Sequence, residues 1–411
     1  MQTTLTWDIF CKVIDNFGDI GVCWRLSQDL AARGQKVRLW VDDTSALAWM
    51  APDAAQVSAP GVQVRTWLDT TPAIGIDAPG DVVIEAFGCE VNAAWIAHNS
   101  VAAYADIHWP TGQLGTDNPA IPTTRKSPPV WINLEYLSAQ PYAARSHGLP
   151  SPVMAGPARG MTKWFFYPGF TAGTGGLLRG VDVALRINDA ALPSAQQRPP
   201  PSAEHTPGPA PASLPPLPPP HAPHPVLPAP LQISLFCYEP PALQSLLTQL
   251  ANAPQPCELL ITAGRATPAM QHAIIHINSL KPLWNQRKQL SIAYQPLMPH
   301  RQFDDLLWSC DLNFVRGEDS LVRALWAGKA FVWQIYPQGD GAHADKLNAF
   351  LDWLQAPPDL RLFHQVWNGL SQAVLPAMDI PSWTAVALTA RARLLQQTDL
   401  TTQLMAFVQS K

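Results

Sequence analysis

The sequence predicts an α/β protein of two domains, each built on a parallel sheet, and three observations support this. Short apolar runs alternate with helical stretches in both halves of the chain, which is typical of parallel sheets covered by helices. A proline-rich stretch separates the two halves. The chain has 411 residues, of which 47% are apolar, so each half is long enough and apolar enough to bury a core.

The first half is expected to contain five strands and one clear helix. Between the first two strands, apolar residues recur at helical spacing from Ile20 to Ala31, and Gly34 marks the end of this helix. Short apolar runs predict strands at residues 7–14, 36–43, 62–68, 81–88 and 129–138.

The second half repeats this alternation, which predicts a second parallel sheet. Its expected strands lie at residues 231–239, 257–264, 290–297 and 310–317. Its expected helices lie at residues 241–252, 301–310 and 320–329. Ligands of open parallel sheets bind at the carboxyl ends of the strands. Two such domains would therefore form one site in the cleft between them.

The proline-rich stretch sets the predicted domain boundaries. Proline lacks an amide donor and disrupts regular structure. We interpret this stretch as an interdomain linker, with a docking site for a proline-recognising partner as the alternative. The predicted division is an N-terminal domain (1–188), the linker (189–230), a C-terminal domain (231–381) and a C-terminal helical segment (382–411).

Composition argues against several classes of function. The net charge of −4 provides no basic field to attract nucleic acid. No apolar run is long enough to span a membrane, and no signal peptide is evident, so we expect a cytoplasmic protein. The six cysteines form no CxxC pair, which favours reduced core thiols over a zinc site or a disulfide framework.

The segment "DNFGD", from Asp15 to Asp19, places two carboxylates in the turn between the first strand and the first helix. Asp19 could simply cap the helix that is expected to begin near Ile20. Alternatively, a carboxylate here would face the cleft and could act as a base. Gly21 would let another part of the chain approach closely.

A second charged junction, "RGEDS" (316–320), follows the strand expected to end at Val315. Asp319 or Ser320 could cap the next helix, which is expected to start near Ser320. In a ligand site, the free amides at the start of that helix would hold a diphosphate. Arg316 could pair with phosphate, and Glu318 or Asp319 could accept hydrogen bonds from sugar hydroxyls.

A third segment, residues 163–180, is rich in glycine and aromatic residues. It lacks the GK[ST] sequence of an ATP-binding P-loop. We expect most of its aromatic side chains to lie in the core and one or two to be able to stack on a base. These residues are Trp164, Phe165, Phe166, Tyr167 and Phe170.

Three long segments resemble the EarP family of bacterial protein-arginine rhamnosyltransferases. They are "DNFGDIGVCWRL", "FFYPGFTAGTGGLLR" and "CDLNFVRGEDSLVRALWAGKAFVWQIYPQ". The resemblance extends over nearly the whole chain outside the proline-rich stretch. It implies a GT-B fold, in which two Rossmann-like domains face each other across a cleft. It also implies transfer of L-rhamnose from dTDP-β-L-rhamnose to an arginine of translation elongation factor P, with inversion and without a metal or cofactor.

The resemblance also assigns roles to individual residues. Asp19 matches the proposed general base, Asp15 the second carboxylate of the same turn, and Glu318 a catalytic acidic residue. The residues implied to bind the donor are Asn16, Phe17, Gly18, Tyr167, His300, Phe303, Arg316, Gly317, Asp319, Ser320 and Tyr336.

Four of these donor positions have more specific implied roles. Phe303 matches a residue that stacks on thymine, Tyr336 one that reaches the diphosphate, and Tyr167 an aromatic position near the nucleotide. His300 stands where the family usually has a glutamine that contacts the base. An imidazole can still form a hydrogen bond with the edge of a thymine.

An arginine acceptor would explain why this turn carries acids. A guanidinium has a pKa above about 12 and is a poor nucleophile because its lone pairs are delocalised. Paired carboxylates can bind its donor fork, orient one nitrogen and accept the proton that it loses. Whether Asp15 or Asp19 takes the proton stays open. A GT-B transferase with a small-molecule acceptor and a non-catalytic nucleotide-binding module are the alternatives.

Overall fold

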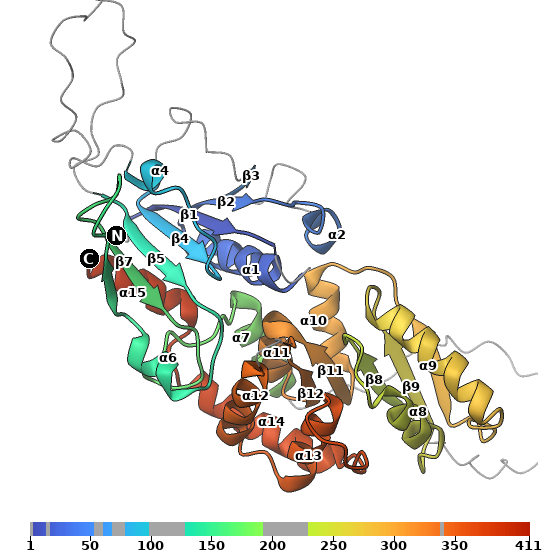
Figure 1. Ribbon diagram of the computed structural model, residues 1–411. Coiled ribbons are helices and arrows are strands. Elements are labelled where there is room, and N and C mark those ends of the chain that lie inside the picture. The colour runs from blue at the N-terminus through green and yellow to red at the C-terminus, as the bar shows by residue number, and fades with distance from the viewer. Residues whose placement is uncertain are drawn as a thin grey trace, which may run out of the picture.

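The computed structural model describes residues 3–13, 17–52, 61–67, 79–97, 128–191, 229–337 and 341–411. These residues form two lobes, each built on one sheet, with the helices α1, α10 and α11 between the sheets (Figure 1). Asp15, Asn16 and most of the predicted linker lie outside the described residues.

The first sheet has the strand order β3-β2-β1-β4-β5-β7-β6, and all of its pairings are parallel except that of β6 with β7. β1 is almost wholly buried because helices and loops cover both faces of the sheet, as its continuous apolar sequence predicts. The strands are β1 (Thr6–Cys11), β2 (Lys36–Val41), β3 (Val62–Thr66), β4 (Val82–Ala86), β5 (Val130–Leu134), β6 (Pro150–Pro152) and β7 (Thr162–Phe166). The helices of this lobe are α1 (Gly18–Ala32), α2 (Leu47–Met50), α4 (Ala93–Ala97) and α6 (Pro141–Ser146).

The second sheet has the order β10-β9-β8-β11-β12 and is parallel throughout. Its strands are β8 (Leu231–Leu235), β9 (Cys257–Ile261), β10 (Leu290–Tyr294), β11 (Leu312–Arg316) and β12 (Ala330–Gln334). Its helices are α8 (Leu243–Ala251), α9 (Ala266–Leu280), α10 (His300–Ser309), α11 (Gly317–Ala327), α12 (Ala342–Leu354) and α13 (Pro358–Trp367). In both sheets the strand order reverses at one point, which is where doubly wound folds bind ligands.

Three further helices connect the lobes: α7 (Val181–Ala191), α14 (Ile380–Leu395) and α15 (Leu400–Gln409). α14 packs on the second lobe, whereas α15 returns to the first lobe and lies beside β5 and β7 (Figure 1). Leu404 and Val408 of α15 pack in the same core as Ile9 of β1. The predicted domain boundaries stay predictions, but the end of the chain clearly contributes to the core of the first lobe.

The structure confirms the two parallel α/β sheets, and each predicted strand overlaps an observed one that is shorter. The sequence interpretation missed β7, β12 and the long helix α9. All six cysteines are buried and free, as predicted. No helix within the described ranges combines the length and the apolar character needed to cross a lipid bilayer.

The aromatic segment around β7 is less buried than the sequence interpretation expected. Phe166 and Phe170 are core residues, each exposed by no more than 2%. Trp164, Phe165 and Tyr167 are only partly buried. Phe165 points to the opposite face of the sheet from Phe166, and the neighbour of β7 on its outer side, β6, is a short edge strand.

Candidate functional site

A pocket with an empty volume of about 670 Å³, partly open to solvent, lies between the two lobes. Much of its lining is aromatic or aliphatic, with a few polar and charged groups, which suits a flat base joined to a polar sugar and an anion. The residues of this interdomain pocket are Phe17, Gly18, Trp49, Met50, Phe236, Thr262, Ala263, Pro296, Leu297, Met298, His300, Phe303, Arg316, Asp319 and Ser320.

Three helices begin at this pocket. α1 starts at Gly18 and α10 at His300, both of which line it, and α11 starts at Gly317, between the lining residues Arg316 and Asp319. The amide end of a helix carries a partial positive charge and unsatisfied N–H donors. Three such ends at one pocket favour an anionic ligand such as a diphosphate.

The start of α11 differs from the sequence prediction. β11 extends to Arg316 and the helix begins at Gly317, so the expected "RGED" loop is instead the first turn of the helix. Neither Asp319 nor Ser320 is the N-cap residue, which is Arg316. The Ser320 hydroxyl accepts a hydrogen bond from the Arg316 N–H at 3.0 Å and contacts the Arg316 carbonyl oxygen. These contacts close the junction tightly.

A second residue fixes the same junction from the neighbouring strand. The Trp333 indole N–H donates to the carbonyl oxygen of Gly317 at 2.7 Å. Gly317 has a φ of 62°, a left-handed conformation that glycine adopts without steric cost. The strand-to-helix turn therefore depends on glycine at this position.

Arg316 is a buried cation at the end of β11, with only 4% of its surface exposed. Its guanidinium carbon lies 4.4 Å from the ring centre of Phe236, 4.5 Å from that of Tyr238 and 6.0 Å from that of Phe17. Its Nη1 also donates to the carbonyl oxygen of Cys237 at 3.3 Å. The surrounding rings hold the positive charge of Arg316 against the pocket.

His300 and Phe303 line the pocket from the first turn of α10. Within the described residues, the buried Nδ1 of His300 makes no hydrogen bond. Burial, together with the nearby Arg25 charge, lowers the pKa of His300 well below its usual value, so the ring is neutral. A neutral imidazole can donate or accept a hydrogen bond, and a ligand would satisfy the unpaired nitrogen. Phe303 lies edge-to-face with Phe236, at 5.2 Å between ring centres.

Asp19 lies in the first turn of α1, next to the lining residue Gly18, and only 4% of its surface is exposed. The helix begins at Gly18 and its N-cap residue is Phe17, so Asp19 is not the N-cap. Two residues on, the backbone at Gly21 comes close to the second lobe. A β-carbon there would lie 3.4 Å from both an Asp319 carboxylate oxygen and the His300 Nε2. α1 thus places Asp19 beside the pocket.

Glu318 belongs to a contact between the lobes and does not line the interdomain pocket. One of its carboxylate oxygens accepts a hydrogen bond from the Leu137 N–H at 2.8 Å, and the other pairs with Lys346 at 2.6 Å. Leu137 follows β5 of the first lobe, whereas Lys346 belongs to α12 of the second. Both oxygens are therefore engaged, and the catalytic role of Glu318 stays a prediction.

The two predicted tyrosines lie apart from each other. Tyr336 follows β12 and packs edge-to-face on Tyr238, at 5.6 Å between ring centres. Tyr238 in turn packs against the guanidinium of Arg316. Tyr167 follows β7 in the first lobe and packs against Tyr142 at 5.8 Å. Among the described residues neither tyrosine lines the interdomain pocket. Their roles in donor binding stay predictions.

Sequence reasoning missed eight of the pocket residues. Most of them follow the carboxyl ends of β8, β9 and β10, where a ligand of a parallel sheet is expected, and this positional rule could have found them. Trp49 and Met50 come instead from the short helix α2, which no sequence signal marked. The missed residues are Trp49, Met50, Phe236, Thr262, Ala263, Pro296, Leu297 and Met298.

The described residues contain no group of three or more His, Cys, Asp or Glu side chains placed to hold a metal ion. The prediction that no metal or cofactor is needed remains a prediction.

The chain matches the model of a family described as Elongation-Factor P (EF-P) rhamnosyltransferase EarP over residues 7–409. A protein-arginine rhamnosyltransferase of Pseudomonas putida is 38% identical over 358 residues, which cover 84% of this chain and 80% of the relative. One of Pseudomonas aeruginosa is 37% identical over 377 residues, which cover 88% and 87%. A solved structure concerned with EarP-mediated arginine glycosylation of translation elongation factor EF-P covers 99% of this chain and 100% of its own, with 26% identity and a TM-score of 0.54.

Two Rossmann-like lobes with a pocket between the carboxyl ends of their strands make this protein a glycosyltransferase of the GT-B fold, as predicted. The match to the family model spans nearly the whole chain, and both Pseudomonas relatives exceed 30% identity. The chain belongs to the EarP family of protein-arginine rhamnosyltransferases.

Proposed function

We propose that this enzyme transfers L-rhamnose from dTDP-β-L-rhamnose to one arginine of translation elongation factor P, with inversion at the sugar carbon. The observation that carries the proposal is the interdomain pocket, where an apolar lining adjoins Arg316 and three helix N-termini. Family membership supports the choice of rhamnose and arginine, since the relatives are named protein-arginine rhamnosyltransferases.

The donor is proposed to bind mainly to the second lobe. Phe303 would stack on the thymine ring, and His300 would form a hydrogen bond with its edge. Arg316 and the amides at the start of α11 would hold the diphosphate. These groups lie at the ends of β11 and the starts of α10 and α11, so the fold positions them before the ligand arrives.

In the reaction, a nitrogen of the acceptor guanidinium forms a bond with C1 of rhamnose while the bond from C1 to the diphosphate oxygen breaks. The nitrogen loses a proton to a carboxylate, for which we propose Asp19, while Asp15 helps to orient the guanidinium. The leaving dTDP carries away the electron pair of the broken bond. Arg316 and the helix amides would stabilise its negative charge without a metal.

The proposed acceptor fits the acids of the first lobe, because arginine is a cation with a planar fork of donors. A translation factor as acceptor implies action in the cytoplasm. The similarity to an EarP structure concerned with EF-P glycosylation supports this partner.

The test is to incubate the purified enzyme with dTDP-β-L-rhamnose and elongation factor P, with a metal chelator present in half of the samples. Mass spectrometry should find one deoxyhexose on a single arginine, in equal yield with and without chelator. NMR of the modified arginine should show the inverted linkage.

Three outcomes would contradict parts of the proposal. Retention of configuration would exclude single displacement, and loss of activity with chelator would contradict a metal-independent reaction. Transfer to a small molecule but not to elongation factor P would instead support a GT-B transferase with another acceptor.

A further inference from the structure

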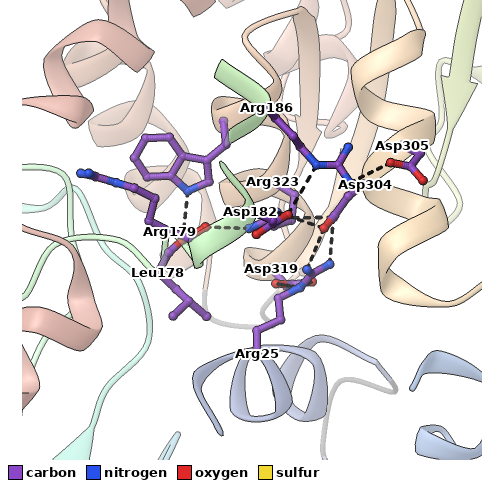
Figure 2. A network of polar contacts seen from close by, with 10 residues as sticks. Arg25, Leu178, Arg179, Asp182, Arg186, Asp304, Asp305, Asp319 and Arg323 are labelled. Atoms are coloured by element: carbon purple, nitrogen blue, oxygen red, sulfur yellow. Dashed lines mark hydrogen bonds and ion pairs between the residues drawn. The ribbon is translucent and has the colours of Figure 1, made fainter. Parts of the chain in front are cut away.

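A cluster of charged residues links the two lobes next to the interdomain pocket, and Arg25 reaches it from α1 of the first lobe. Figure 2 shows Arg25 reaching from the first lobe to two carboxylates of the second. Its Nη1 and Nη2 each lie 2.9 Å from a different oxygen of Asp304, and its Nε lies 3.0 Å from Asp319. One guanidinium thus contacts both α10 and α11.

Arg25 and Asp304 form a buried ion pair, in which the attraction between the charges outweighs the cost of burying them. Only 10% of the Arg25 side chain and 3% of that of Asp304 are exposed. Burial alone would lower the pKa of Arg25, but Asp319 and Asp304 together raise it above its usual value. Burial alone would raise the pKa of Asp304, but Arg25 and Arg323 lower it to about 2. Both groups are therefore charged at neutral pH.

The carboxylates that Arg25 contacts belong to the donor side of the pocket. Asp304 directly follows Phe303, and Asp319 itself lines the pocket. Arg25 lies on the same helix as Asp19, in the lobe that faces the acceptor. The contact therefore fixes the helix of the proposed base relative to the helices of the proposed donor site.

Asp304 has a second cation within its own lobe. Arg323 of α11 donates to it through Nε at 3.1 Å and through Nη2 at 3.0 Å. Loss of Arg25 would therefore leave no unpaired charge buried at Asp304, and the second lobe should keep its fold. Arg323 lies in the same lobe as Asp304, whereas the contacts of Arg25 join Asp304 to α1 of the first lobe.

We infer that Arg25 is a positioning residue that holds the two lobes in the arrangement needed for transfer. Its three N–H donors join one helix of the first lobe to two helices of the second, and a lysine ammonium cannot reproduce that fork. The effect on turnover rests on the proposed function, whereas the effect on lobe position does not.

The test compares Arg25→Met with Arg33→Met, a matched control on the same helix. Arg33 also contacts two carboxylates, Asp29 at 3.0 Å and Asp399 at 2.8 Å, but both belong to the packing of α1 and α15 within the first lobe. Arg25→Met should lower turnover by about 10²-fold, because a small displacement of the reacting groups is enough for such a loss. Its affinity for dTDP should change only a few-fold. Arg33→Met should lower the melting temperature more than turnover.

Lobe position can be measured without any assay of activity. Ser45 of the first lobe and Gln271 of α9 are exposed, and all six native cysteines are buried. Labels at Ser45→Cys and Gln271→Cys would therefore report the distance between the lobes by pulsed EPR, with dTDP absent or present. Arg25→Met should broaden or lengthen that distance, and Arg25→Lys should restore it only in part.

An unchanged distance distribution in Arg25→Met would overturn the inference, as would an equal change in Arg33→Met. Full activity in Arg25→Lys would show that charge alone is enough and would also contradict it. A wild-type protein that modifies no elongation factor P would overturn the proposed function instead, and the distance measurement would then decide the role of Arg25.

Discussion

Two strand-to-helix junctions face each other across the pocket, and they are built differently. The junction from β11 to α11 is fixed by Ser320, by the indole of Trp333 and by the rings around Arg316. The N-cap residue of α1, Phe17, forms no side-chain capping hydrogen bond, and it packs on Trp49 from the short helix α2. The second lobe therefore offers a surface whose groups are held in place by hydrogen bonds and ring contacts of its own.

The difference fits a division of labour between binding and reaction. A donor that must bind in one orientation benefits from groups held rigidly before it arrives. A base must instead meet an acceptor on another protein, so its junction has to stay accessible from the cleft. The comparison predicts that changes at the α1 junction alter turnover, whereas changes at the α10 and α11 starts alter donor binding.

The largest effect is expected for Asp19→Asn. Asparagine keeps the size of the side chain but removes its charge, so loss of a general base should lower turnover by about 10²-fold or more. The affinity for dTDP should stay the same, because Asp19 is assigned to the acceptor side. Rates of rhamnosylation of elongation factor P and calorimetric titration with dTDP measure the two quantities.

Asp29→Asn is the control for that change. Asp29 lies on the same helix, is buried and pairs with Arg33 at 3.0 Å, away from the pocket. The Asp29→Asn variant should be less stable than wild type but should keep its turnover at temperatures below its melting point. This is the opposite of the pattern expected for Asp19→Asn. If Asp19→Asn reacts at the wild-type rate, Asp19 is not the base.

A smaller effect on turnover is expected for Glu318→Gln. The glutamine oxygen can still accept the N–H of Leu137, but the charge that pairs with Lys346 is lost. Removing a charged hydrogen-bonding group is worth about 1.5–3 kcal/mol, which corresponds to about 10- to 150-fold in rate if that energy is used in the transition state.

Lys346→Met separates the two possible roles of Glu318. It removes the same ion pair but leaves the carboxylate and its contact with Leu137. If Glu318 acts on the reacting groups, this variant should stay within a few-fold of wild type. Equal losses in the two variants would mean that Glu318 serves the contact between the lobes.

A change at the α10 start should affect binding and leave maximal turnover largely intact. Phe303→Ala removes the proposed stacking surface for thymine, which is worth about 1–3 kcal/mol, or roughly 5- to 150-fold in the Kd for dTDP. At saturating donor the rate should approach that of wild type. A variant with unchanged dTDP affinity and a reduced maximal rate would reverse the proposed division between the two junctions.

Local sequence signals were enough to predict most of the strands but not the charge partners that hold the site. Strands such as β1 and β11 are continuous apolar runs, so their burial followed from composition. The charges of "RGED" suggested a loop, whereas the structure has a helical turn there. Asp319 pairs with Arg25, 294 positions away in the sequence, and Glu318 pairs with Lys346 of α12. Tertiary contacts of this kind leave no periodic signal.

The pocket residues at the start of α10 were predicted for a different reason. The resemblance supplied His300 and Phe303 one position at a time, whereas no pattern indicated Phe236 or Trp49. β7 was missed because its aromatic residues were considered together with the following glycines as one segment, to which no strand was assigned. The strand exists because it pairs with β5 in parallel, which is a property of the sheet and not of the segment alone.

The smallest effect on turnover at neutral pH is expected for a change at His364, which supports the α11 junction through a hydrogen bond with Trp333. Its Nε2 accepts the N–H of Trp333 at 3.0 Å, and the indole of that residue donates to Gly317. Burial lowers the pKa of His364 from the usual 6.5 to about 4, so the folded protein keeps the ring neutral. His364→Gln can still accept that hydrogen bond and should leave turnover at neutral pH unchanged.

The difference should instead be visible as stability in acid. Between pH 6.5 and about 4 the unfolded chain binds a proton at His364 and the folded chain does not, so this contribution is complete above pH 6.5 and is lost toward pH 4. It amounts to about 3 kcal/mol at most. Melting temperatures measured across this pH range should therefore fall less steeply for His364→Gln than for wild type. They should still fall in both proteins, because His147 and His300, whose pKa values are also lowered, remain in both. Parallel curves would mean that His364 is not what couples the fixed junction to pH.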